Sequence, residues 1–308
     1  MHYPGLSYLA IKTDMLKFRF TLFFLCFTIS AHAQNRDENL HDMIQGIRQE
    51  AITFYEVSGY QVFHQALQKP ISDKSIKKFK KKYGFDKDLL PSTIKLDQEY
   101  LVFETSRSLV EGNLQPGRAH YTYQDEKGNG FLIGFTYLSS RDTAIEHYMV
   151  NAIRSKTLPE TVYSPQRVDS IKYAGRYIQL GPACRWMNTH NIQCPNYGQM
   201  NWSEFRDSTR AVEMTEFQRA LNNQKFLTKE KESNYVDVLF EGVETRVLRT
   251  KVKIKLPKLV VGGSNVLVVY YVTAKVRDRY VSCVFSHYTD DVNAEGLPPL
   301  LSEVMELK

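Results

Sequence analysis

The chain has 308 residues, of which 43% are hydrophobic and 12% aromatic, and its formal net charge is +6 at pH 7. This composition is ample for a packed core and excludes a disordered protein. The small positive charge argues at most weakly for an acidic partner.

A secretory signal peptide is predicted at the N-terminus. Lys17 and Arg19 precede an apolar run at 20–29, which is followed by the small-residue sequence Ala31-His32-Ala33. We expect cleavage near Ala33, removal of residues 1–33, and a secreted or periplasmic mature chain. Met15 resembles the natural initiator methionine of such a signal peptide. Residues 1–14 would then be an over-extended start of the chain.

The apolar run is about ten residues long, against the roughly 20 that a membrane-spanning helix requires. No later segment is longer, so we expect no transmembrane helix in the mature chain. Secretion also disfavours nucleic acid as a partner.

Apolar periodicity predicts helices at 37–58, at 72–83 ending at Gly84, and from Asp142 or Thr143 to about 156. The second helix carries a basic patch formed by Lys77, Lys78, Lys80, Lys81 and Lys82. Such a patch suits an anionic glycan, a lipid headgroup or a nucleic acid, but a charge run of this kind is more often a solvated helix face. We favour the solvated face.

β-Branched and aromatic residues predict a strand from about 94 to 103, followed by a hairpin of 118–124 with 131–138. The turn between the hairpin strands is Lys127-Gly128-Asn129-Gly130, whose residue types favour a tight reversal.

Two cysteines and both tryptophans of the chain lie within 181–205. A disulfide between Cys184 and Cys194 is predicted, and closing this loop constrains the unfolded chain by about 2.5 to 3 kcal/mol. A metal site using Cys184, His190 and Cys194 is the rival interpretation, but the spacing fits no zinc motif and a fourth ligand is lacking.

The same stretch holds the residues that we predict to bind a ligand: Arg185, Trp186, His190 and Trp202. An indole offers a flat apolar face to a sugar or a peptide, whereas the alternative is that both tryptophans cap the core beside the bridge. We favour packing over binding for the two tryptophans.

The C-terminal part reads as a helix at 208–222, although the spacing of Val212 and Met214 also suits a strand. A polar surface linker at 228–234 and strands at 235–240, 245–256, 266–276 and 279–288 follow. A short closing helix is expected at 297–307, entered through Pro298 and Pro299.

We therefore predict an α+β fold of antiparallel sheets with packed helices, arranged as two similar helix-strands-helix layers; one continuous sheet is the weaker alternative. The predicted parts are the signal peptide, an N-terminal α+β module at 34–160, a disulfide-loop segment at 161–206, and a C-terminal α+β module at 207–308.

No nucleophile elbow, phosphate-binding loop or metal-binding motif occurs in the sequence. Cys283 and His287 resemble a thiol-protease pair, but their strand context predicts that Cys283 is buried. We expect no cofactor, no metal and no catalytic residue. The leading hypothesis is a secreted, non-catalytic binding protein of the cell envelope, whose partner is an unknown protein or an envelope glycan. The alternatives are a hydrolase whose site is assembled from distant residues, and a structural assembly subunit.

Overall fold

The computed structural model describes residues 40–67, 70–110, 113–165, 168–181, 184–196, 198–224, 228–255, 264–289, 292 and 296–308. The chain divides into two compact units, Met1–Asp42 and Met43–Lys308. Only residues 40–42 of the first unit are described, so the predicted signal peptide and its cleavage site near Ala33 lie outside the described residues.

The protein is mostly β, and the predicted α+β fold with two helix-strands-helix layers is wrong. The main reason is that the two segments expected to open and close these layers, 37–58 (of which 40–58 are described) and 297–307, consist over their described residues largely of strands and turns, with one short helix, α6 (Pro299–Ser302), in the second. Among the described residues of the second unit, the helices are α2 (Asp73–Tyr83), α3 (Thr143–Ser155), the 3-10 turn η1 (Glu160–Val162), α4 (Ser208–Asn223) and α6.

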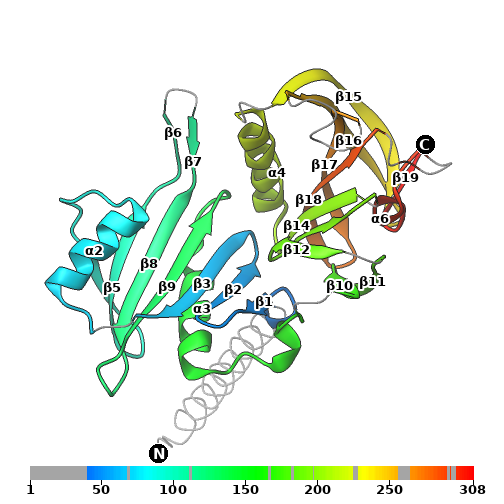
Figure 1. Ribbon diagram of the computed structural model, residues 1–308. Coiled ribbons are helices and arrows are strands. Elements are labelled where there is room, and N and C mark those ends of the chain that lie inside the picture. Colours follow the sequence, from blue (N-terminus) through cyan, green and yellow to red (C-terminus); the bar gives the residue numbers. More distant parts are fainter. Residues whose placement is uncertain are drawn as a thin grey trace, which may run out of the picture. The chain divides into compact units, whose positions relative to one another are not determined.

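The first of two large sheets has seven antiparallel strands in the order β1-β2-β3-β9-β8-β5-β4 (Figure 1). Its strands are β1 (Gln45–Arg48), β2 (Ile52–Val57), β3 (Tyr60–Ala66), β4 (Ser92–Lys95), β5 (Glu99–Thr105), β8 (Gly117–Gln124) and β9 (Gly130–Tyr137). The predicted hairpin is confirmed as β8–β9.

Helices α2 and α3 pack on opposite faces of this sheet, because successive side chains along a strand point to opposite sides. On one face the ring of Phe79 from α2 lies 4.9 Å from that of Phe103. On the other face Tyr121 donates a hydrogen bond to Glu146 of α3. Both helices were predicted within two residues of their observed bounds.

The residues at the two ends of α2 explain why its bounds could be predicted. Ser72 and Ser75 form a capping box at the N-terminus, and Gly84 ends the helix with φ 70°, in the left-handed region that glycine adopts readily.

The predicted helix at 37–58 is wrong, since this segment contains β1 and β2. The apolar positions near 44 satisfy a helical period, but 52–57 is rich in β-branched and aromatic residues, which favour a strand. Ser58 and Gly59 both have positive φ, 49° and 83°, so they form the two-residue turn that joins β2 to β3.

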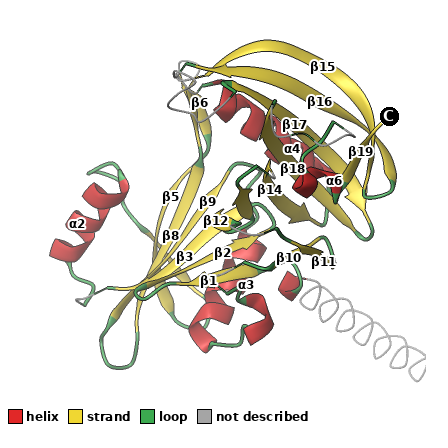
Figure 2. Cartoon of the chain, turned by 45° about the vertical axis from the view of Figure 1, so that its right-hand side comes forward, coloured by secondary structure: helices red, strands yellow, loops and turns green. Residues whose placement is uncertain are grey.

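The second large sheet has eight antiparallel strands in the order β12-β13-β14-β18-β17-β16-β15-β19 and curls strongly (Figure 2). Its strands are β12 (Arg185–Asn188), β13 (Asn191–Cys194), β14 (Gly198–Phe205), β15 (Thr228–Phe240), β16 (Val243–Ile254), β17 (Val266–Val276), β18 (Arg279–Tyr288) and β19 (Met305–Leu307). Two further hairpins are β6 (Ser108–Val110) with β7 (Asn113–Gln115), and β10 (Ser170–Tyr173) with β11 (Arg176–Gln179).

The predicted surface linker at 228–234 is wrong, because these residues form the first half of β15. The run is polar, but its backbone pairs with β16, as in the partners Ser233 and Thr250. Pairing of main-chain groups, rather than burial of side chains, therefore places this segment in the sheet.

The two faces of the eight-stranded sheet have different covers. One face carries the main core, in which Trp202, Phe240 and Phe285 are packed beneath β10–β11 and α6. The other face is covered in part by α4, where the Thr215 hydroxyl lies 2.7 Å from both Thr273 Oγ1 and Ser282 Oγ.

The two large sheets meet at the β2–β3 turn. Arg210 of α4 donates a hydrogen bond of 3.1 Å to the carbonyl of Ser58. Gly59 approaches the Phe205 ring so closely that an added Cβ would lie 2.7 Å from it. Only a glycine combines the positive φ with this approach, so the turn is a fixed junction.

Candidate functional site

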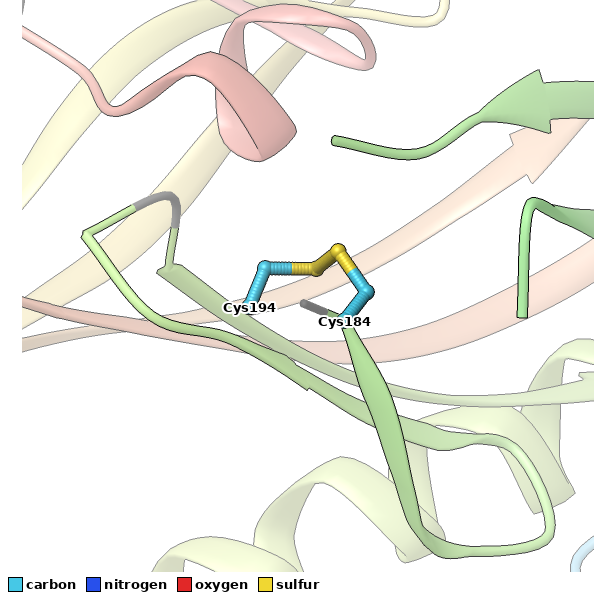
Figure 3. The surroundings of a disulfide bond; sticks show 2 residues. All are labelled: Cys184 and Cys194. Atoms are coloured by element: carbon cyan, nitrogen blue, oxygen red, sulfur yellow. A yellow bond between two sulfur atoms is a disulfide. The ribbon is translucent and has the colours of Figure 1, made fainter. Parts of the chain in front are cut away.

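The predicted disulfide is confirmed: Cys184 and Cys194 are bonded and connect β12 to the end of β13 (Figure 3). It anchors an edge of the eight-stranded sheet, and β13 in turn pairs with β14.

Trp202 and His190, two of the predicted binding residues, lie inside the protein. The indole of Trp202 is fully buried. The ring of His190 stacks on it at 4.7 Å with an interplanar angle of 13°, and that of Tyr173 meets it edge-on at 6.0 Å. These contacts make Trp202 a part of the core.

Arg185 and Trp186, the other two, are nearer to solvent. Arg185 is exposed and donates to Gln193, while the indole NH of Trp186 donates to the carbonyl of Pro165 at 3.3 Å. A binding role for these four residues stays a prediction, and two of them, Trp202 and His190, are buried.

The face of β14 opposite Trp202 contributes to a pocket of about 600 Å³ beside α4. Along β14, Gln199 and Asn201 alternate with Met200 and Trp202, so the amides face the pocket while the two apolar side chains face the core. Seven of the sixteen lining residues carry side-chain amides: Gln61, Asn191, Gln199, Asn201, Gln218, Asn222 and Asn223.

Several of these amides are already oriented by neighbours. Gln199 Nε2 donates to Asn191 Oδ1 at 3.0 Å, and Asn222 Nδ2 donates to the hydroxyl of Tyr271 at 3.1 Å. Gln218 Oε1, in contrast, is buried and has no hydrogen-bond partner among the described residues. A buried acceptor without a partner is costly, and this oxygen has no accessible surface through which a ligand in the pocket could reach it.

The rest of the lining is largely apolar and almost without charge. Burial raises the pKa of Tyr271 and keeps its hydroxyl protonated, and Glu230 is the one lining residue with an ionisable carboxyl group. The remaining lining residues are Leu138, Leu221, Val252, Leu267, Val269, Val284 and Ser286. The pocket thus offers donors, acceptors and apolar patches, a combination suited to a neutral ligand that has both hydroxyl groups and apolar faces.

The amides of the pocket were not predicted from the sequence. The signal was present as alternation within one strand, where the polar residues at 199 and 201 alternate with Met200 and Trp202. The contribution of α4 was also readable, since Gln218 and Asn222 are four residues apart on a predicted helix.

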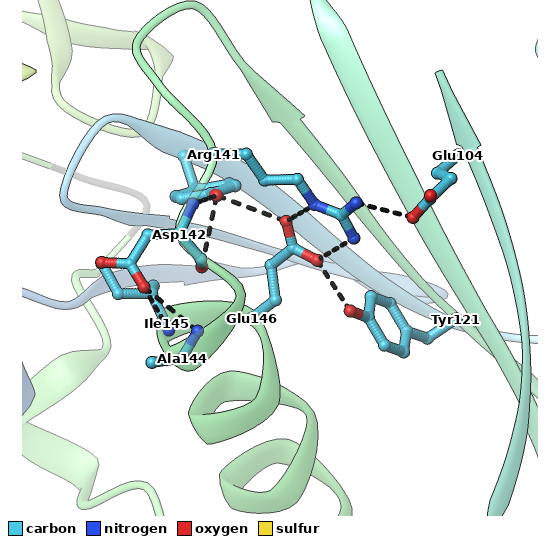
Figure 4. Close-up of polar contacts among 8 residues, drawn as sticks. Glu104, Tyr121, Arg141, Asp142, Ala144, Ile145 and Glu146 are labelled. Atoms are coloured by element: carbon cyan, nitrogen blue, oxygen red, sulfur yellow. Dashed lines mark hydrogen bonds and ion pairs between the residues drawn. The ribbon is translucent and has the colours of Figure 1, made fainter. Parts of the chain in front are cut away.

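The most elaborate polar cluster surrounds Glu146, whose side chain is fully buried (Figure 4). Arg141 donates to both of its oxygens at 2.8 Å, and the hydroxyl of Tyr121 donates at 2.7 Å. Burial and the adjacent Glu146 carboxylate raise the pKa of Tyr121. Because both carboxylate oxygens are already occupied, this cluster holds α3 against the sheet and has no free group for chemistry.

Cys283 is fully buried, and burial raises the pKa of its thiol well above the ordinary value. A buried neutral thiol is a poor nucleophile. His287 stacks on Tyr270 and its Nδ1 lies 2.8 Å from the carbonyl oxygen of Tyr288. Among the described residues there is also no group of three or more acidic, histidine or cysteine side chains placed to hold a metal ion.

Searches against models of protein families, against curated proteins and against solved structures found no match. In the part of the chain that the structure describes, no helix has the length and apolar character needed to cross a bilayer. The geometry of the pocket is therefore the main guide to function.

Proposed function

We propose that this chain is a non-catalytic binding protein of the cell envelope, and that its amide-lined pocket takes a neutral, hydroxyl-rich ligand such as an envelope glycan. The observation that carries the proposal is the set of seven amides around one cavity. An amide presents a donor and an acceptor side by side, which matches the hydroxyl groups of a sugar ring.

The size and charge of the cavity support the same ligand class. Its volume of about 600 Å³ lies within the range of small-molecule sites, roughly 300 to 1,000 Å³. A lining with a single carboxyl group and no lysine or arginine favours a neutral ligand over a phosphate or a sulfate.

Secretion is part of the proposal and has two supports. The N-terminal sequence has the three regions of a signal peptide, and the Cys184–Cys194 bond is typical of an oxidising compartment. N-terminal sequencing of the mature protein tests this point, and a chain that retains residues 1–33 would contradict it.

The binding test is calorimetry of the mature chain with a panel of neutral oligosaccharides, with wild type compared to Gln218→Met and Asn201→Leu. Each substitution keeps the approximate volume and removes a polar contact, so we expect affinity to fall about tenfold per variant, the equivalent of roughly 1.4 kcal/mol.

Gln193→Met is the matched control. Gln193 lies on β13, which pairs with β14, but it does not line the pocket. The proposal predicts wild-type affinity for this control. If Gln218→Met and Asn201→Leu bind as tightly as wild type, or if no oligosaccharide binds, the pocket does not have the proposed function.

A further inference from the structure

A second pocket, of about 440 Å³, lies between α2 and the seven-stranded sheet and is separate from the amide-lined pocket. Its apolar lining comes from the helix, from the sheet and from the connection before the helix. The side chains concerned are Leu67, Ile71, Ile76, Phe79 and Phe103.

The neutral polar groups of this pocket are satisfied within the protein. Gln65 Nε2 donates to the hydroxyl of Tyr83 at 2.9 Å, and Thr122 Oγ1 donates to the carbonyl of Leu101 at 3.2 Å. Ser75 is engaged in the capping box of α2. These groups therefore stabilise the wall and leave an apolar surface for a ligand.

Lys78 and Lys82 are the two charged residues of the lining, and no carboxylate accompanies them. They are four residues apart on α2, so they lie on one side of the helix. The other lysines of the basic patch differ: Lys80 donates to the carbonyl of Lys87, and Lys77 and Lys81 do not line the pocket.

We propose that this pocket binds a single-chain anionic amphiphile, a fatty-acid carboxylate, with its acyl chain against Leu67, Ile76 and Phe79 and its head group beside Lys78 and Lys82. The pairing of an apolar cavity with two cations at its lining matches both parts of such a ligand. This site is independent of the proposed glycan function.

The occupant is a free amphiphile and not a bilayer surface, because the apolar side chains line a cavity behind the helix. Two of them, Phe79 and Phe103, contact each other and belong to the core cluster beneath α2. A single chain can enter this cavity, and each additional methylene that it buries is expected to strengthen binding about fourfold.

The test measures binding of decanoate to the mature chain by calorimetry, with decanol and decyltrimethylammonium as neutral and cationic analogues of the same chain length. We expect decanoate to bind at least tenfold more tightly than either analogue. The variant Lys78→Gln/Lys82→Gln is expected to remove most of this preference.

Lys77→Gln/Lys81→Gln is the matched control, with the same helix, the same spacing and the same loss of charge. It is expected to bind decanoate as wild type does. Ala66→Phe fills the pocket from an exposed position on β3 and is expected to abolish binding of all three amphiphiles, with folding verified by circular dichroism.

Three results would overturn the proposal: equal binding of the cationic and anionic analogues, equal losses in the two lysine pairs, or binding to anionic phosphatidylglycerol vesicles without binding of free decanoate. Gln218→Met separates the two sites, since it should leave decanoate binding unchanged whatever the outcome with oligosaccharides.

Discussion

His190 Nδ1 lies 2.6 Å from Oε2 of Glu56, and each side chain is only 4% exposed. His190 belongs to the β12–β13 turn of the eight-stranded sheet, whereas Glu56 is on β2 of the seven-stranded sheet. The other oxygen of Glu56 accepts from the amide of Gly59 at 2.8 Å. One buried carboxylate thus ties the β2–β3 turn to the second sheet.

Replacing Glu56 by Gln should destabilise the protein by about 1 to 3 kcal/mol, because the new amide can keep the bond to Gly59 but loses the carboxylate facing His190. The measurement is the free energy of unfolding in urea. In a double-mutant cycle with His190→Asn, the losses of unfolding free energy should be strongly non-additive, as expected for residues in contact.

Glu232→Gln is the control for this cycle. Its carboxylate pairs with Lys251 at the surface and is half exposed, so the expected loss is below about 1 kcal/mol. If Glu56→Gln and Glu232→Gln lose the same free energy of unfolding, the buried contact with His190 stabilises the protein no more than the surface pair does.

Stability should fall as the pH drops from 7 to 5. Burial lowers the pKa of His120 to about 3 and that of His64 to about 4, from an ordinary value of 6.5. Below pH 6.5 the unfolded chain takes up protons that the folded chain does not bind, so acid favours unfolding. For His120 alone the loss is about 2 kcal/mol between pH 7 and pH 5.

His120→Phe should flatten this pH dependence, because the site is surrounded by the rings of Phe63, Phe79 and Phe85 and suits a neutral aromatic residue. Urea unfolding at several pH values checks the slope. The control His147→Gln on α3 leaves His120 in place and should retain the pH dependence of the unfolding free energy. If His120→Phe shows the same pH dependence as wild type, His120 is not its cause.

Removing the disulfide with Cys184→Ala/Cys194→Ala should lower the free energy of unfolding by about 2.5 to 3 kcal/mol. Reductant should produce a similar loss in the wild type and no further loss in the variant. Cys283 should stay unmodified by thiol reagents in the folded protein, since it is fully buried. A variant as stable as wild type would mean that the loop is already ordered in the unfolded chain.

Arg141→Met should lower the free energy of unfolding by about 3 to 5 kcal/mol, because it leaves the buried Glu146 without its cationic partner. Adding Glu146→Gln should recover part of this loss by removing the buried charge. Arg48→Met is the exposed counterpart, with Arg48 paired to Glu160 at the surface, and should change stability by less than about 1 kcal/mol. Thermal unfolding compares the three variants.

Much of the secondary structure was readable from local patterns. Helix α2 has clear caps, and strands β17 and β18 have long β-branched and aromatic runs. All three elements were therefore predicted at their observed positions. The errors arose where tertiary pairing decided the outcome. At 37–58 a helical period concealed two strands, and at 228–234 a polar run became a strand because β16 satisfies its backbone.

The candidate site was less accessible to sequence reasoning. The stretch that contains Trp202 does border the pocket, but through Gln199 and Asn201 on the other face of the strand. The pocket also needs Gln218 and Asn222 from α4, and the packing of this helix on the sheet is a long-range contact that no local pattern reveals.

The strand order also bears on synthesis of the chain. All strands of the seven-stranded sheet lie between residues 45 and 137, whereas Gln199 of β14 pairs with Ser286 of β18. The first sheet can therefore pair while the ribosome is still adding later residues. Strand β14 can pair with β13 early, but its other edge, beside Met200 and Trp202, has to wait until β18 has been made, and in this interval a nascent chain most needs protection from association with others.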